Sequence, residues 1–328
     1  MTRGSRPIGH DAIVTRLERL ASAVRQKAYA RVHHAYIFSG PCGVGKWTTA
    51  RWWTTRLKCE APDGCKGDCR SCRQIAAGSH PDVTVCEPEE KGKQIKIEQI
   101  RDLIRSMALR AQREGPRVAL IKARDLLTFE AQSAMLKLLE EPPGTSIIIM
   151  VVENPSALLA TVRSRCQTLP FGTLMKDELV GLITANGQTT EIAEQAAAIS
   201  RGRAARALAY DPEALAARAT LIGEFEELRG DRHADIEPLV TKIVDKKNPR
   251  DEWLETLFEW QIAKIEASVG CPITEADSGL RALLDKLERH HTHRLIDEAA
   301  KMNFTRSVIA RRANAKLALR ELLLDIRT

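Results

Sequence analysis

Residues 34–48 read His-Ala-Tyr-Ile-Phe-Ser-Gly-Pro-Cys-Gly-Val-Gly-Lys-Trp-Thr, a short apolar run that leads into a glycine-rich turn. The turn matches a phosphate-binding loop at Gly40, Gly45 and Lys46, where glycine N–H groups wrap phosphates and a lysine reaches the outer ones. The run at 34–39 predicts a buried strand and 46–57 predicts the helix that follows the loop. Strand, loop and helix in this order favour a P-loop domain.

One position of the loop departs from the pattern. A magnesium-binding Ser or Thr normally follows the lysine, and Trp47 stands there instead. Thr48 is no simple substitute, since one more residue on a helix turns the side chain by about 100°. The pattern predicts nucleotide binding without efficient hydrolysis, or neither; it leaves ATP or ADP open and argues against Mg²⁺. The degenerate nucleotide site comprises Gly40, Gly43, Gly45, Lys46 and Thr48.

The acidic residues of a metal site are missing as well. In P-loop ATPases an Asp at the end of a neighbouring strand orients the Mg²⁺ shell, and a following Glu often polarises the attacking water. The strand expected at 117–121 is followed by Lys122 and Ala123. Hydrolysis therefore loses every metal contact that the protein normally supplies.

Further apolar runs lie at 83–86, 118–121 and 147–152, between helical patterns at 97–113 and 128–141. Strands that alternate with helices favour a parallel sheet covered on both faces. The second helical pattern ends at Glu140-Glu141-Pro142-Pro143, because a proline pair cannot extend a helix. An amphipathic helix is expected at 11–32, whereas after Pro170 the strand signal disappears and 173–328 is helical throughout.

Composition gives the broad class. The chain has 328 residues, 44% of them hydrophobic and 28% charged, which predicts a soluble globular protein of two or three domains. We expect a cytoplasmic location, since no apolar run approaches the ~18 residues of a membrane span and no signal-type stretch follows the first residues. The net charge of +7 is spread along the chain and is weak evidence for nucleic acid.

Four cysteines fall in one short window, Cys59, Cys65, Cys69 and Cys72. Four thiolates interleaved with Gly, Asp and Lys can close a tetrahedral zinc site with no open position, so the metal would be structural. The alternative is a set of free or redox thiols, and Cys69-x2-Cys72 alone fits that reading. The clustering favours zinc over disulfides.

A third group is Arg163-Ser164-Arg165-Cys166, which precedes the short apolar stretch 169–171. Taken alone, an arginine in a loop is most often a solvated charge. The group gains weight only together with the motifs elsewhere in the chain.

In chain order these motifs resemble the bacterial clamp-loader subunits of the AAA+ class, and the resemblance spans nearly the whole chain. The residues that carry it are 34–41, the four-cysteine insert, Ser79-His80-Pro81-Asp82, 136–143, Ser164-Arg165-Cys166 and 314–324. The resemblance implies a RecA-like P-loop domain with a zinc insert at 1–171, a small helical lid at 172–212 and an all-α collar at 213–328. It also implies a hetero-pentamer with gamma or tau and delta subunits, which loads the beta sliding clamp on primer–template DNA for DNA polymerase III, at no membrane.

The resemblance further implies a division of labour. In the family, gamma or tau subunits hydrolyse ATP at subunit interfaces, and each site receives an arginine from the neighbour's Ser-Arg-Cys motif. Arg165 is the expected arginine finger, with Ser164 and Cys166 holding its geometry. Ala205 stands at the place of the family's second-sensor arginine, and Val151 or Val152 at that of the first sensor. The chain then has no ATPase activity of its own, although it is a subunit of a DNA-directed DNA polymerase.

Two alternatives stay open from the sequence. One is an active ATPase of the gamma or tau type with unusual metal ligands. The other is a zinc-module DNA-binding protein that only borrows the fold, for which salt-sensitive DNA binding lost on zinc removal would be the sign.

Overall fold

The structure, a computed structural model, describes residues 6–61, 65, 67–90, 94–123, 127–231, 233–245, 250–272, 278–285, 292–310 and 313–327. The chain divides into two compact units. The first holds Met1–Gly187 with Gly202–Arg206, and the second holds Gln188–Arg201 with Ala207–Thr328. The boundaries of a separate lid and collar stay a prediction. Among the described residues, none of the helices combines the length and apolar character that a membrane crossing requires.

The described part of the first unit is built on a parallel sheet with the order β2-β3-β4-β1-β5. The strands are β1 (Ala35–Ser39), β2 (Val83–Cys86), β3 (Arg117–Lys122), β4 (Ser146–Val151) and β5 (Gln167–Pro170). The expected strands at 34–39, 83–86, 117–121 and 147–152 are confirmed to within a residue or two. One expectation is wrong: β3 is not a neighbour of the P-loop strand β1, because β4 lies between them.

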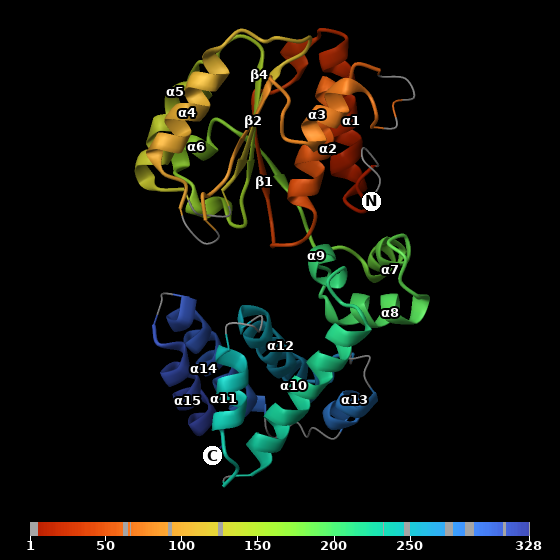
Figure 1. The fold of residues 1–328 in the computed structure, drawn as a ribbon, viewed down its shortest axis with the longest axis vertical. Coiled ribbons are helices and arrows are strands. Elements are labelled where there is room, and N and C mark those ends of the chain that lie inside the picture. The colour runs from red at the N-terminus through yellow and green to blue at the C-terminus, as the bar shows by residue number, and fades with distance from the viewer. Residues whose placement is uncertain are drawn as a thin grey trace. The chain divides into compact units, whose positions relative to one another are not determined.

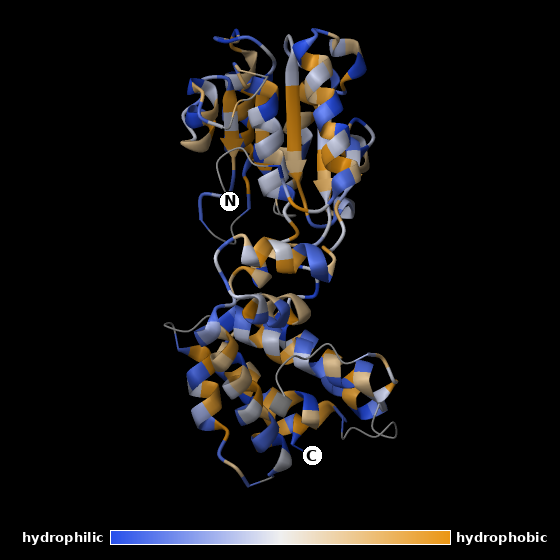
Figure 2. Cartoon of the chain, turned by 90° about the vertical axis from the view of Figure 1, so that its right-hand side faces the viewer, coloured by the Kyte–Doolittle hydropathy of each residue, from blue (hydrophilic) through white to orange (hydrophobic). Residues whose placement is uncertain are grey.

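Helices cover both faces of this sheet, as the alternation of strands and helices predicted (Figure 1). One face carries α1 (Asp11–Arg25), α2 (Lys46–Lys58) and α3 (Arg70–Ala76). The other carries α4 (Ile97–Ala108), α5 (Phe129–Glu140) and α6 (Ala160–Arg163). The short segments η1 (Tyr29–Arg31) and η2 (Pro155–Ala157) and the helix α7 (Lys176–Thr184) complete the unit. The strands in the middle of the sheet are mostly orange, that is hydrophobic, in Figure 2. Apolar residues are expected there, because β1 and β4 are buried along their whole length.

Three elements differ from the sequence-based expectation. The helix expected at 97–113 ends at Ala108, because the backbone turns extended at Leu109. The helix expected at 11–32 ends at Arg25, because Lys27 adopts a left-handed φ of 58° that breaks the helical path. Strand β5 was not predicted, since Leu169 is its only buried residue and Pro170 follows it. Pairing with β1 at the sheet edge makes it a strand.

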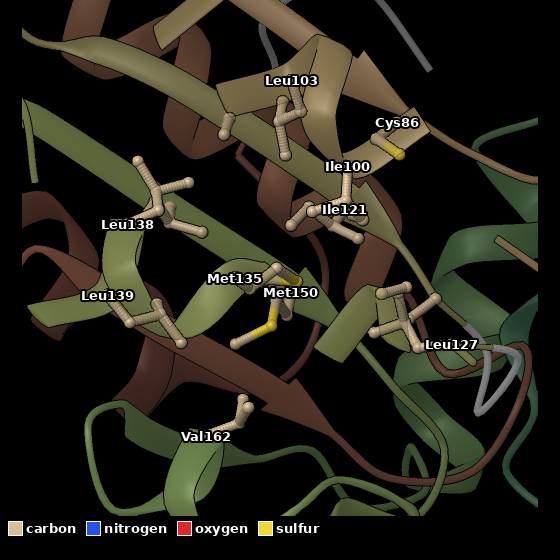
Figure 3. Close-up of a cluster of buried hydrophobic side chains, with 14 of the residues drawn as sticks. Cys86, Ile100, Leu103, Ile121, Leu127, Met135, Leu138, Leu139, Met150 and Val162 are labelled. Carbon is tan, nitrogen blue, oxygen red and sulfur yellow. The ribbon is translucent and has the colours of Figure 1, made fainter. Parts of the chain in front are cut away.

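The core between the sheet and the second helix layer draws on several elements (Figure 3). Leu103 of α4 and Met135 of α5 are 1% and 0% exposed, and they pack with Ile121 of β3 and Met150 of β4. Val162 of α6 belongs to the same cluster. Helices α5 and α6 are therefore anchored to the sheet by buried side chains.

The second unit is helical in all of its described residues. Its helices are α8 (Thr190–Ile199), α10 (Pro212–Gly230), α11 (Glu237–Val244), α12 (Arg250–Ser268), α13 (Ser278–Asp285), α14 (Thr292–Ala310) and α15 (Ala315–Ile326). The chain enters it for the second time through α9 (Ala204–Ala207). Inside the bundle, Glu226 of α10 accepts hydrogen bonds from Trp260 Nε1 and Lys264 Nζ of α12, each at 2.8 Å. The buried ammonium is thus paired, as burial of a charge requires.

Candidate functional site

The loop at 40–46, the candidate phosphate-binding loop, has three glycines with positive φ. Gly40, Gly43 and Gly45 have φ values of 136°, 82° and 98°, which L side chains rarely adopt. At Gly40 a Cβ would also lie 2.0 Å from the carbonyl oxygen of Phe171. Lys46 is 5% exposed and its Nζ donates to the carbonyl oxygens of Gly40 and Pro41, each at 2.5 Å. The lysine is folded against its own loop.

Two contacts hold the loop from outside, and neither was predicted. The Nε2 of His10 is 2.9 Å from the carbonyl oxygen of Val44. The backbone N–H of Ala205 donates to the carbonyl oxygen of Gly43 at 2.9 Å. Ala205, the residue aligned with the second-sensor arginine, therefore does lie beside the loop, but it brings no guanidinium to it.

The two residues that replace the metal ligands contact each other. Lys122, at the end of β3, places its Nζ 5.3 Å from the centroid of the Trp47 ring, within cation–π range. The same Nζ lies 3.4 Å from Glu87 Oε2. The two positions at which the sequence pattern expected metal ligands are thus filled by an ammonium and an indole in contact with each other. Thr48 is exposed on α2.

The four cysteines converge as the zinc prediction requires. Their Sγ atoms all lie within 4.8 Å of one another, and Cys65 Sγ is 3.8 Å from Cys72 Sγ. Four sulfurs at about 2.3 Å from a tetrahedral zinc would be about 3.8 Å apart, so the spacing fits the metal. A hydrogen bond from the N–H of Cys69 lowers the pKa of the Cys65 thiol to about 6. Cys69 also caps α3, whose Cys72 N–H lies 3.5 Å from the Cys69 sulfur.

A buried ionic cluster lies next to this module, and no periodicity of the chain predicts it. Asp82 is 0% exposed and accepts from Lys58 Nζ at 2.9 Å, with Arg117 Nη1 at 3.5 Å. Burial alone would raise the pKa of Asp82, but the backbone N–H of Gln112 and the Lys58 ammonium hold it below its usual value. Lys58 directly precedes Cys59, so the cluster fixes the start of the four-cysteine module to the sheet.

A second link to the module runs through His80. Its Nε2 lies 2.7 Å from Ser71 Oγ, and its Nδ1 accepts the backbone N–H of Asp82 at 3.1 Å. Burial lowers the pKa of His80 to about 4, and the nearby Lys58 charge reinforces the shift. The motif Ser79-His80-Pro81-Asp82 thus joins α3 to β2.

The Ser-Arg-Cys motif lies between α6 and β5. Arg165 Nη2 is 2.7 Å from Glu140 Oε1, and Nη1 donates to the carbonyl oxygen of Thr161 at 2.9 Å. Ser164 Oγ donates to the same carbonyl at 3.1 Å. Cys166 packs against the core, and burial raises the pKa of its thiol to about 12. Because α6 and α2 cover opposite faces of the sheet, Arg165 is not grouped with the chain's own loop (Figure 1).

Comparisons with known proteins find subunits of DNA polymerase III. Residues 15–175 match the family described as DNA polymerase III, delta subunit. The chain is 42% identical over 135 residues to the DNA polymerase III subunit delta-prime of Pseudomonas aeruginosa, which is 40% of this chain and 41% of that protein. It is 32% identical over 164 residues to the subunit tau of Bacillus subtilis, which is 49% of this chain and 28% of tau. The chain thus spans about two fifths of the length of the delta-prime relatives.

Among solved structures, the chain is similar to a DNA polymerase III gamma subunit-related protein of Thermotoga maritima. The TM-score is 0.47 at 19% identity, and the alignment covers 95% of this chain and 98% of the other.

Proposed function

Residues 15–175 match the family described as DNA polymerase III, delta subunit, and the chain is similar to delta-prime subunits; from this premise we propose that it belongs to the delta-prime family and is the non-hydrolysing stator of a bacterial clamp loader. It completes a hetero-pentamer with gamma or tau and delta subunits, which places the beta sliding clamp on primer–template DNA in the bacterial cytoplasm. Segments 172–212 and 213–328 serve as lid and collar. The chain is then part of a DNA-directed DNA polymerase holoenzyme and has no ATPase activity of its own.

The contact between Trp47 and Lys122 carries the non-hydrolysing part of the proposal. A divalent ion that bridges phosphates needs oxygen ligands, whereas these positions offer an indole and an ammonium 5.3 Å from the ring centroid. The ammonium would repel Mg²⁺, so nucleotide bound at the loop would lack the metal that hydrolysis uses.

Arg165 supports the second part of the proposal, the donation of an arginine to the ATP site of a neighbouring subunit. Its side chain is 35% exposed, and its backbone is held on both sides, by Ser164 at the end of α6 and by the partly buried Cys166, which packs against the core. An arginine in this condition can reach the γ-phosphate of a neighbouring subunit, where a donated guanidinium accelerates hydrolysis by about 10³ to 10⁵ in well-studied cases.

We further propose that Cys59, Cys65, Cys69 and Cys72 hold a structural Zn²⁺. All four positions of a tetrahedral ion would be filled by sulfur, which leaves none for water or substrate. The metal would close the module that Lys58 and His80 join to the sheet.

The test uses the loader reconstituted with its gamma or tau and delta subunits, the clamp and primer–template DNA. Arg165→Ala should lower DNA-stimulated ATP hydrolysis, and Arg163→Ala, two residues earlier, should not. Unchanged turnover with Arg165→Ala would refute the finger assignment. ATP hydrolysis by the isolated chain above that of Lys46→Ala would favour an active gamma or tau-type subunit instead.

A further inference from the structure

We propose that Glu140 is a positioning residue for the donated arginine, holding the Arg165 guanidinium in place while it contacts a neighbour's phosphate. The inference rests on the proposed function of Arg165. It assigns a role to Glu140, the last residue of α5. The proline pair at 142–143 explains why the helix ends there but not why a carboxylate stands at its end.

The contact geometry leaves the guanidinium able to bind a second anion. Arg165 Nη2 lies 2.7 Å from Glu140 Oε1, while Nη1 donates to Thr161 O at 2.9 Å and lies 3.4 Å from Ser164 Oγ. A guanidinium has five N–H donors in a fixed plane. These three contacts use at most three of the five, so N–H donors remain for a phosphate oxygen without the carboxylate being released.

Both partners stand on anchored backbone. Leu138 and Leu139, which precede Glu140, are 3% and 1% exposed in the core of the first unit. Cys166, which follows Arg165, packs against the same core. The ion pair therefore joins two elements of fixed position. Because Glu140 does not move with the arginine, the pair restricts the side-chain rotations of Arg165.

The location of Glu140 is unfavourable unless a cation faces it. It is the last residue of α5, where the helix dipole presents partial negative charge and disfavours a carboxylate. The Arg165 guanidinium offsets that repulsion. Because Glu140 is 49% exposed, the pair adds little to folding stability, and its effect should be found in the orientation of the arginine.

The experiment compares Glu140→Gln with Glu141→Gln, the exposed carboxylate one residue later, in the reconstituted loader. We expect Glu140→Gln to lower the kcat of DNA-stimulated ATP hydrolysis about 5-fold, the factor equivalent to the ~1 kcal/mol upper range of exposed ion pairs. The KM for ATP should stay unchanged, since the arginine acts on the transition state. Glu141→Gln should match the wild type.

Three further measurements separate positioning from a structural role. In an Arg165→Ala background, Glu140→Gln should cause no additional loss, because it acts only through the arginine. In the isolated full chain, ¹⁵N spectra of the Arg165 side chain should show restricted guanidinium rotation that Glu140→Gln abolishes and Glu141→Gln preserves. Thermal unfolding of both variants should match the wild type.

The outcomes distinguish the two proposals. If Arg165→Ala slows the loader and Glu140→Gln does not, positioning by Glu140 is refuted and the finger stands. If Glu140→Gln slows the loader equally with and without Arg165, the carboxylate has a structural role and the inference is wrong. If Arg165→Ala leaves turnover normal, the proposed function and this inference both fail.

Discussion

The buried imidazole of His80 should make the stability of the first unit depend on pH in a calculable way. Its Nδ1 accepts the N–H of Asp82 and its Nε2 faces Ser71 Oγ, so the neutral ring carries its proton on Nε2. A second proton on Nδ1 would point at the Asp82 N–H. The imidazole is 4% exposed, and burial lowers the pKa of His80 from 6.5 to about 4.

The sign of the effect follows from linkage. Since the folded-state pKa lies below the unfolded one, the unfolded chain binds the proton first as the pH falls, and protonation favours unfolding. The stabilisation is complete above pH 6.5, is lost progressively down to about pH 4, and changes no further below that. The two pKa values give a loss of about 1 kcal/mol at pH 5.5 and about 3 kcal/mol at pH 4.

The measurement compares the wild type with His80→Gln, whose amide can accept the Asp82 N–H and donate to Ser71 but does not titrate. Hydrogen exchange of the β1 amides, corrected for the intrinsic pH dependence of exchange, reports the free energy of opening of the first unit. Between pH 7.5 and 5.5 the variant should lose about 1 kcal/mol less of its free energy of opening than the wild type. If the free energy of opening falls by the same amount with pH in the wild type and in His80→Gln, the reasoning is refuted. His233→Gln, an exposed residue of the second unit, should leave the wild-type slope intact.

Two further predictions concern the same region. Asp82→Ala leaves Lys58 buried without its partner and should destabilise the first unit by about 3–5 kcal/mol, a fall of roughly 10 °C in the calorimetric Tm; Asp102→Asn, in an exposed pair, is the control, and equal shifts would contradict the argument. The purified chain should contain one zinc by native mass spectrometry and Cys72→Ser should lose it, while a chelator lowers the Tm of the first unit and leaves the second unchanged; full zinc retention in the variant would remove the assignment.

The sequence predicted those parts of the fold that depend on local pattern. The apolar runs predicted β1, β3 and β4 nearly to the residue, because strands buried on both faces are continuously hydrophobic, and the short run at 83–86 predicted the less buried β2. Gly40, Gly43 and Gly45, which mark the loop in the sequence, all have positive φ in the structure. Strand β5 was missed because an edge strand with one buried residue, Leu169, has no such pattern.

Contacts between distant charged residues could not be predicted in this way. Lys58 and Asp82 would ordinarily be placed on the surface, and only their mutual pairing explains why both side chains are 0% exposed. The pairing of Glu140 with Arg165 is of the same kind, since the two residues share no local periodicity. In both cases the three-dimensional partner, rather than the residue type, decides the role.

If the chain is the non-hydrolysing subunit proposed above, the mutual contact of Trp47 and Lys122 has an evolutionary consequence. Restoring a hydroxyl at position 47 alone would strip Lys122 of its indole while leaving an ammonium where Mg²⁺ must bind. Restoring a carboxylate at position 122 alone would set that anion against an indole face, which carries partial negative charge. Each single reversion thus passes through an intermediate that has neither the present contact nor a working metal site. A return to hydrolysis would therefore require both positions to change together. A lineage that has acquired both substitutions would more readily keep a structural role than regain hydrolysis.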